Sequence, residues 1–313
     1  MFEFSLLVLG LAGLWAGSEV LIRGAMSLAD RFRVSDMFIG MLILAVGTDL
    51  PELFVAFDAS AHKLTEAGYE GIIIGSAIGS AIGQFALVFG VAGFIGFAPR
   101  PLRLATRNSV FLLGGLVALT VFSLDGVISR FEGAVLIALY MGYLWTLFVW
   151  PAIGMEEFAP EPTHPLSKDV FYLLVGLGIL LISAELTVVY AARVATLVGL
   201  SNYAVSALII GLGSSLPELC VSLVALFKNR GGLTVGNLLG SNVLDTLLVP
   251  GVGAALAPLM VPAGVLVLDL PVQALVTLLV LGFLYVSPRG VKAPEASILL
   301  MIYACYFWLR LTA

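Results

Sequence analysis

The segment AVGTDLPELF, residues 45–54, places two carboxylates and a proline inside an otherwise apolar stretch of the chain. The segment GLGSSLPELC, residues 211–220, repeats the pattern. Because proline has no amide hydrogen, a helix through Pro51 or Pro217 leaves the carbonyl four residues earlier without its usual partner. Those carbonyls belong to Gly47 and Gly213. The two segments therefore predict two interrupted helices of the same kind.

The composition places the chain in a membrane. Hydrophobic residues make up 60% of its 313 residues and charged residues 11%, whereas soluble chains carry about 25% charged residues. The beginning, MFEF, lacks the basic residues of a cleaved signal peptide, so we expect the first span to be retained. A helix needs about 20 apolar residues to span a bilayer. The apolar runs predict ten spans, near residues 3–22, 35–60, 70–96, 106–124, 131–150, 169–190, 199–227, 233–257, 263–286 and 294–311.

The distribution of lysine and arginine predicts the orientation of these spans, because cytoplasmic loops are enriched in both. With ten spans, eleven of the 15 basic residues fall on one side and four on the other. We therefore expect the larger group in the cytoplasm and both termini outside, in a plasma or inner membrane. The larger group is Arg23, Arg31, Arg33, Arg100, Arg103, Arg107, Lys168, Lys228, Arg230, Arg289 and Lys292, and the smaller is Lys63, Arg130, Arg193 and Arg310.

The chain also contains an internal repeat, which constrains its architecture more than any other feature. A shift of 166 residues pairs Glu52 with Glu218, and a shift of 161 pairs Ser80 with Ser241. The expected parts are a first five-span repeat (1–150, signature 40–91), a cytoplasmic linker (151–168) and a second five-span repeat (169–313, signature 206–252).

An odd number of spans in each half means that the second copy enters the membrane from the opposite face. Such inverted-topology repeats are typical of secondary transporters, whose substrate sites lie near the middle of the membrane where the repeats meet. The sequence therefore predicts an all-α integral membrane fold with ten transmembrane helices, arranged as two inverted five-helix repeats.

Each repeated segment brings oxygen ligands to one helix face. Thr48 and Glu52 are four residues apart, as are Ser214 and Glu218, so each pair shares a face. The carbonyls freed by the prolines lie beside these pairs. Carboxylate, hydroxyl and carbonyl oxygens are hard ligands that suit Ca²⁺ or Na⁺. We therefore expect cation ligands at both breaks.

Polar side chains also follow two further helices at intervals of four residues. Small residues at the same interval let helix backbones approach closely, so we expect these polar lines to face the interrupted helices. The second repeat has Asn237, Ser241 and Asp245 beside Gly236 and Gly240, and the first has Ser76, Ser80 and Gln84 beside Gly75, Gly79 and Gly83.

The energetic cost of the acidic residues indicates what they do. An acid near the middle of a membrane costs roughly 2.5–3.5 kcal/mol, so Asp49, Glu52, Glu218 and Asp245 together cost on the order of 10 kcal/mol. The three spans that carry them contain no lysine or arginine. Protons or bound cations must then supply the balancing charge, and this predicts a transport site.

Two other interpretations of the acidic segments stay open at this point. DLPE and SLPE each fit a capping box, in which Asp49 or Ser215 caps a helix and the glutamate is its third residue. Four acids could also line a passive cation channel. An intramembrane enzyme does not fit, because the paired acids are glutamates behind prolines and we expect His62 and His164 in loops. We therefore expect no enzyme.

The motifs GTDLPE…GSAIGSAIGQ and GSSLPE…GNLLGSNVLD resemble the two alpha-repeats of the Ca²⁺/cation antiporter superfamily, which includes the sodium/calcium exchangers. The resemblance covers residues 40–91 and 206–252. It implies alternating access, with Ca²⁺ and Na⁺ competing for overlapping sites, and it implies that Glu52 and Glu218 are the central Ca²⁺ ligands. The resemblance further implies that the cation sites are lined by Thr48, Ser80, Ser214, Ser215, Ser241 and Asp245, with the carbonyls of Gly47 and Gly213 beside them.

The first repeat departs from the family pattern at two important positions. Asp49 stands where the family usually has Ser, and Gln84 stands where it usually has Asn. Gln84 is one methylene longer than Asn, so it fills space that Asn leaves. Asp49 adds a fourth negative charge, which could hold an extra monovalent ion or a proton. We include both residues among the expected ion ligands.

We expect a secondary active antiporter that exchanges Ca²⁺ for Na⁺, with proton-coupled exchange of Ca²⁺ or another cation as the alternative. The transported ions are then Ca²⁺ and Na⁺, with H⁺ or K⁺ as further candidates, and no cofactor is expected. The expected partners are small inorganic cations and the lipid bilayer. Nothing in the sequence indicates nucleic-acid binding or an obligatory protein partner.

Overall fold

The computed structural model describes residues 2–62, 70–95, 102–149, 164–197, 213, 215–286 and 291–312. Six of the described helices are long and apolar enough to cross a membrane, and a seventh span results if one bent pair is counted as a single helix. Two shorter apolar helices cover Arg107–Ser123 and Leu216–Phe227. The first part of the predicted span at 199–227 lies outside the described residues.

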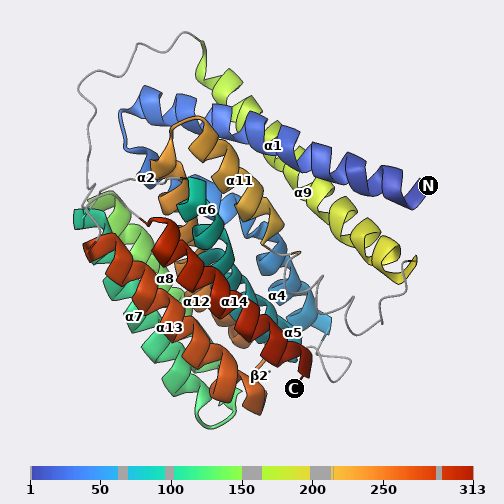
Figure 1. The fold of residues 1–313 in the computed structure, drawn as a ribbon. Helices are drawn as coiled ribbons and strands as arrows, with labels where there is room; N and C mark the ends of the chain where they lie inside the picture. The colour runs from blue at the N-terminus through green and yellow to red at the C-terminus, as the bar shows by residue number, and fades with distance from the viewer. Residues whose placement is uncertain are drawn as a thin grey trace.

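Helices α1 (Phe2–Phe32) and α9 (Leu166–Leu197) form a long antiparallel pair that crosses the other helices obliquely (Figure 1). Glycines make this pair possible. A Cβ atom on Gly17 would lie 2.6 Å from the backbone nitrogen of Leu180, and one on Gly176 would lie 2.3 Å from that of Leu21. No side chain fits at such distances, so the two backbones touch directly.

Helix α1 ends ten residues beyond the predicted span, because its last turns are tied to neighbouring elements by charged groups. Arg31 Nε lies 2.7 Å from Asp169 Oδ2, and Ser27 Oγ donates to Asp169 Oδ1 at 2.6 Å. Arg230 pairs at 2.8 Å with both Asp30 and Asp36. These ion pairs fasten the end of α1 to the beginning of α9 and to the core helices.

We expect Asp169→Ala to destabilise the protein by about 3 kcal/mol, the lower end for a broken buried ion pair, because Arg31 and Ser27 then lose their partner. Asp169 is fully buried and Arg31 is largely so. Thermal unfolding in detergent checks this, with Glu185→Ala, an exposed acid on the same helix, as the control. Equal melting temperatures for the two variants would contradict the prediction.

The first interrupted helix runs through four elements, α2 (Asp36–Ile39), η1 (Gly40–Leu44), α3 (Ala45–Thr48) and α4 (Leu50–His62). Ser35 begins it by accepting a hydrogen bond from the Phe38 amide at 3.2 Å. The axis bends by 42° between Thr48 and Leu50. This is the break that Pro51 predicts. The expectation of a loop at His62 is wrong, because α4 continues to that residue without a helix-breaking residue.

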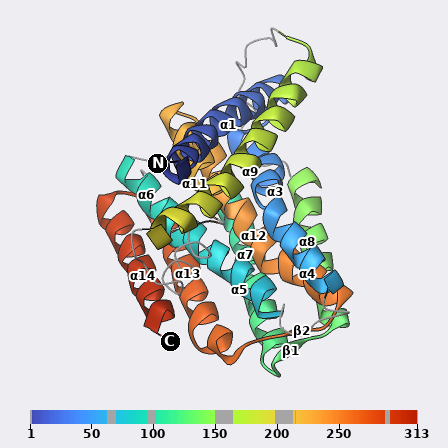
Figure 2. The same cartoon turned by 90° about the vertical axis from the view of Figure 1, so that its right-hand side faces the viewer.

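The remaining elements complete the bundle around one central helix, α12. They are α5 (Glu70–Ile82), η2 (Gly83–Val88), α6 (Phe89–Ile95), α7 (Leu102–Ser123), β1 (Val127–Ile128), α8 (Arg130–Val149), α11 (Leu216–Phe227), α12 (Gly231–Leu256), β2 (Leu259–Met260), η3 (Val265–Asp269), α13 (Leu270–Val286) and α14 (Ala293–Thr312). Figure 2 shows α12 enclosed by its neighbours.

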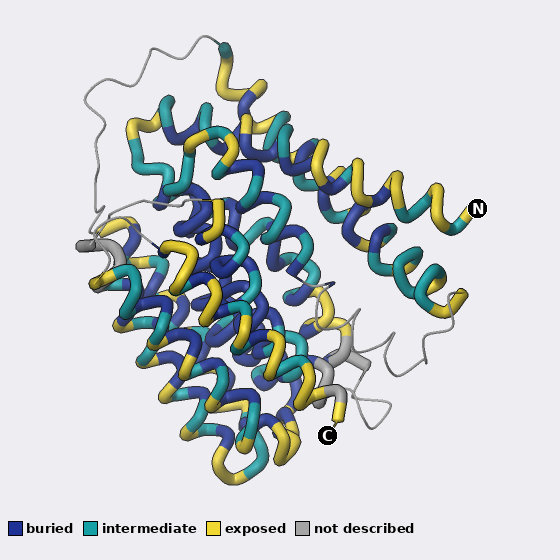
Figure 3. Tube along the Cα trace, in the orientation of Figure 1, coloured by how far each residue is buried: buried dark blue, intermediate teal, exposed yellow. Residues whose placement is uncertain are grey.

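The glycine line on α12 packs against the first interrupted helix, as the sequence predicts. A Cβ atom on Gly236 would lie 2.2 Å from the carbonyl oxygen of Met37, and one on Gly240 would lie 2.8 Å from the Cα atom of Met41. Helix α12 is almost wholly buried, and the buried residues gather at the centre of the bundle in Figure 3. The polar line on α12 therefore lies against the break at residue 49.

The outer faces of the bundle carry large exposed apolar side chains. Examples are Leu9 on α1, Trp145 on α8, Ile182 on α9 and Val267 in η3, which are 59–78% exposed. So many exposed apolar side chains mark a surface that meets lipid and not water. The surface agrees with the composition of the chain.

A short antiparallel strand pair is the departure from an all-α structure that the sequence did not predict. Val127 pairs with Met260 and Ile128 pairs with Leu259, so the turn between α7 and α8 is joined to the turn before η3. Gly126 permits this with a φ of 85°, a backbone conformation that other residues rarely adopt. Two-residue strands carry no periodic pattern, and only the packing of the helices brings them together.

Candidate functional site

Both prolines stand in the first turn of a helix, directly after a residue with the same backbone geometry, and we refer to these two places as the first and the second break. Asp49 has φ −88° and ψ 5°, and Ser215, at the matching position of the second repeat, has φ −90° and ψ 0°. A new helix starts directly after each of them, with Pro51 and Pro217 as its second residue. The backbone thus enters both helices in the same way.

The candidate site lies where these breaks meet η2, α5 and α12. All of its polar side chains that the structure describes are buried. They are Thr48, Asp49 and Glu52 from the first break, Ser215 and Glu218 from the second, Ser80 and Gln84 from α5 and η2, and Ser241 and Asp245 from α12. Gly47 is half-buried and Gly213 is buried, while Ser214 lies outside the described residues.

Three of the carboxylates form a close group. The Asp49 carboxyl group lies next to that of Glu218 and to the Ser241 hydroxyl. Glu52 interacts electrostatically with Asp49 and lies beside Ser80. None of the six oxygens of these three acids, and neither hydroxyl of Ser215 and Ser241, has a hydrogen-bond partner among the described residues. Buried acids without partners repel one another and need a balancing positive charge.

The fourth acid, Asp245, is held differently. Its Oδ2 atom accepts a hydrogen bond from Gln84 Nε2 at 3.1 Å, and the same nitrogen lies 3.2 Å from Ser80 Oγ. Asn242 Nδ2 donates to Gln84 Oε1 at 2.7 Å. Gln84 therefore bridges α12 and α5 within the site.

Two asparagines of α12 contribute to the site beyond the expected ligands. Asn237 Oδ1 lies 3.5 Å from Thr48 Oγ1, and Asn242 holds Gln84. Asn237 stands four residues before Ser241, so the spacing along α12 already placed it on the face that was expected to meet the interrupted helices. Asn242 is off that line, and no local signal in the sequence identified it.

The capping-box interpretation of the acidic segments is wrong. Ser215 makes no side-chain capping hydrogen bond at the beginning of α11, and neither Asp49 oxygen has a partner among the described residues. With ψ near 0° at both residues, the chain turns into the next helix without the extended backbone that an N-cap usually has. The side chains are thus available for other ligands.

The acids alone do not build a metal site. Among the described residues, no three His, Cys, Asp or Glu side chains are arranged to hold one metal ion. The hydroxyl, carbonyl and amide oxygens beside the acids offer a cation a mixed set of ligands. Such sets are typical of Na⁺ and Ca²⁺, which accept neutral oxygen ligands.

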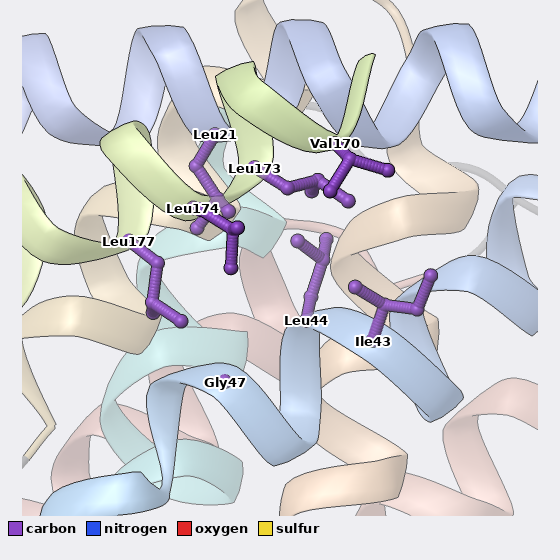
Figure 4. A pocket seen from close by; sticks show the side chains of 8 residues that line it. All are labelled: Leu21, Ile43, Leu44, Gly47, Val170, Leu173, Leu174 and Leu177. Carbon is purple, nitrogen blue, oxygen red and sulfur yellow. The ribbon is translucent and has the colours of Figure 1, made fainter. Parts of the chain in front are cut away.

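A separate cavity of about 130 Å³ lies between the α1–α9 pair and the first interrupted helix (Figure 4). Its walls are apolar, and they include Leu21, Ile43, Leu44 and Leu177. Gly47 is the point where this cavity reaches the break, but no carboxylate lines it. An apolar cavity offers no ligand to an ion, so this space is not the cation site.

Comparisons with known proteins agree with this geometry. The model of the sodium/calcium exchanger protein family matches residues 2–149 and 168–312. The sodium/calcium exchanger MaX1 of Methanosarcina acetivorans is 26% identical over 97% of each chain. An uncharacterized membrane protein of Methanocaldococcus jannaschii is 32% identical over 95% of this chain and 94% of its own.

Solved structures give the same result. A structure of the sodium-calcium exchanger NCX_Mj soaked with Na⁺ and Ca²⁺ superimposes with a TM-score of 0.81 and 29% sequence identity, and the match covers 97% of both chains. With the family model, the buried acids and the lipid-facing surface, this match establishes the class of the molecule. The chain is a multi-pass membrane protein that belongs to the sodium/calcium exchanger family of cation antiporters.

Proposed function

We propose that the chain exchanges Ca²⁺ for Na⁺ across the membrane by alternating access at the site around Glu52 and Glu218. The observation that carries this proposal is the group of buried carboxylate oxygens without hydrogen-bond partners among the described residues. No lysine or arginine occurs in the segments that form the site. Cations are then the groups that can balance the charge, and relatives named as sodium/calcium exchangers share the fold.

The proposed ligands come from both breaks and from the two polar lines. Hydroxyl and carbonyl oxygens complete a coordination shell that two or three acids cannot complete alone. We propose the set Thr48, Asp49, Glu52, Ser80, Gln84, Ser214, Ser215, Glu218, Ser241 and Asp245, with the carbonyls of Gly47 and Gly213.

We further propose that ten helices form two inverted five-helix repeats, 1–150 and 169–313, joined by a cytoplasmic linker. The matching backbone angles at Asp49 and Ser215 support a structural repeat. The ion pairs of Arg31 and Arg230 bring two members of the larger basic group to the end of α1. We propose that this end is cytoplasmic and that both termini lie outside. In that arrangement the site lies between the two copies.

Purified protein in liposomes tests the exchange directly. We expect ⁴⁵Ca²⁺ uptake when Na⁺ is loaded inside and diluted outside, because outward Na⁺ flow drives Ca²⁺ inward through a shared site. Uptake under a pH gradient without Na⁺ is the comparison. Uptake that ignores Na⁺ and follows the pH gradient would overturn Na⁺ coupling. Flux that continues without any counter-ion would indicate a channel.

One observation favours proton coupling as the second candidate. Asp49 brings a fourth carboxylate to the site and lies next to Glu218. A charge of −4 exceeds what one Ca²⁺ ion neutralises, so a proton or a monovalent ion could accompany it. The pH-gradient arm of the same experiment distinguishes these cases, with Asp49→Ser as the matched variant.

A further inference from the structure

We propose that Gln84 fills one cation position of the site, the position between Asp245 and Ser80. In this chain, Asp49 then supplies the charge for a replacement position beside Glu218 and Ser241. The inference rests on the proposed cation antiport and concerns where the ions bind within that site. It assigns Gln84 and Asn242 as residues that determine the number and placement of the ions.

The hydrogen bonds of Gln84 show that its amide group occupies the space between Asp245 and Ser80. Its amide nitrogen lies 3.1 Å from Asp245 Oδ2 and 3.2 Å from Ser80 Oγ. An amide NH₂ group has two hydrogens to donate and no lone pair to offer a cation. Gln84 therefore presents donors to the oxygens that would otherwise ligate an ion. All three side chains are fully buried, so water does not compete for these contacts.

Asn242 fixes the direction in which the Gln84 amide points. Asn242 Nδ2 donates to Gln84 Oε1 at 2.7 Å and to the Leu238 carbonyl at 3.2 Å. Because Oε1 is engaged on that side, the NH₂ group must face Asp245. The oxygen of Gln84 is thus unavailable to an ion next to Asp245. Asn242 is a positioning residue that acts through Gln84.

The backbone supports the same placement. Gln84 stands in the first turn of the wide η2 helix, which begins at Gly83. A Cβ atom on Gly83 would lie 2.6 Å from Ser215 Oγ, so η2 lies directly against the second helix break. Such single wide turns occur frequently at functional sites. The long Gln84 side chain therefore enters the site from a fixed position.

The acids without hydrogen-bond partners indicate where the replacement cation position lies. Asp245 has one oxygen engaged by Gln84, whereas both oxygens of Asp49 and both of Glu218 have no partner among the described residues. Asp49 also lies next to the Ser241 hydroxyl, which has no partner among those residues either. A cation between these three groups gains two carboxylates and a hydroxyl. Asp49 also interacts electrostatically with Asp245, so this position adjoins the one that the Gln84 amide fills.

A double-mutant cycle tests whether the cation position beside Asp49 replaces the one that Gln84 fills. The variants are Asp49→Ser, Gln84→Asn and their combination, and the probe is thermal stabilisation of the purified protein by CaCl₂ and by NaCl. We expect Asp49→Ser alone to weaken Ca²⁺ binding at least 10-fold. In the Gln84→Asn background the same change should cost less than 3-fold, because the shorter amide leaves the position at Asp245 open. Equal losses in the two backgrounds would overturn the inference.

Two further variants distinguish a change in where the cations bind from a general loss of protein stability. Gln84→Glu keeps the length but removes the donors, and we expect it to raise the Hill coefficient for Na⁺ by about one. Asn242→Ala should shift Na⁺ binding in the direction of Gln84→Asn, because Gln84 is then no longer held. An unchanged Hill coefficient in a monodisperse Gln84→Glu protein would contradict the proposal. These binding measurements need no transport, so a wild type that binds cations without exchanging them would refute antiport and leave this test intact.

Discussion

Glu218→Gln abolishes Na⁺-driven ⁴⁵Ca²⁺ uptake in liposomes, with an expected loss of at least 100-fold. Glu218 is fully buried beside Asp49 and within electrostatic range of Glu52. One unit charge about 4 Å from a cation is worth about 4 kcal/mol at an effective dielectric constant near 20. Glutamine keeps the shape of the side chain but loses that attraction.

Glu185→Gln is the matched control for this result. Glu185 is an exposed glutamate on α9, whereas the four acids of the site are buried. We expect Na⁺-driven ⁴⁵Ca²⁺ uptake by the Glu185→Gln protein to remain within about 2-fold of that by the wild type. Substantial Ca²⁺ uptake by Glu218→Gln, in protein that elutes as a single species, would show that the ion path does not use the second break.

Gly236→Leu is expected to prevent stable folding. A Cβ atom at this position would lie 2.2 Å from the Met37 carbonyl oxygen and 2.9 Å from its Cα atom. Backbone atoms cannot move aside as a flexible side chain can, so α12 and α2 must separate. Overpacking typically costs about 1–3 kcal/mol, and we expect this contact to lie at or above the upper limit.

Size-exclusion chromatography in detergent measures this outcome as loss of the monodisperse peak. Gly178→Leu is the control, because a Cβ atom there meets nothing within 4 Å among the described residues. A monodisperse Gly236→Leu protein with an unchanged melting temperature would mean that α12 does not pack against α2 as closely as described.

Much of the site follows from local sequence patterns. Pro51 and Pro217 identify the two breaks because the loss of an amide hydrogen acts within one helix. The interval of four residues places Thr48 with Glu52, and it needs no knowledge of the partner helix. The glycines of α12 predicted a close helix contact, and Gly236 and Gly240 make one with the first interrupted helix.

Other features depend on which helices become neighbours. The contact of Gly17 and Gly176 joins α1 to α9, and neither glycine belongs to a motif that indicates its partner. The charge of Asp49 suggested a helix cap as readily as an ion ligand. Burial among other acids, without a capping hydrogen bond, decided against the cap.

The sequence by itself determined the membrane class, the two helix breaks and the family, because composition, proline positions and short motifs are properties of the chain alone. The tertiary structure decided what each polar group faces. Gln84 meets Asp245 and Asn242 across 161 and 158 residues of sequence. Such a contact is set by the packing of whole helices, so no spacing along the chain encodes it. For the same reason, Asn242 belongs to the site only because α12 packs against η2, where Gln84 lies.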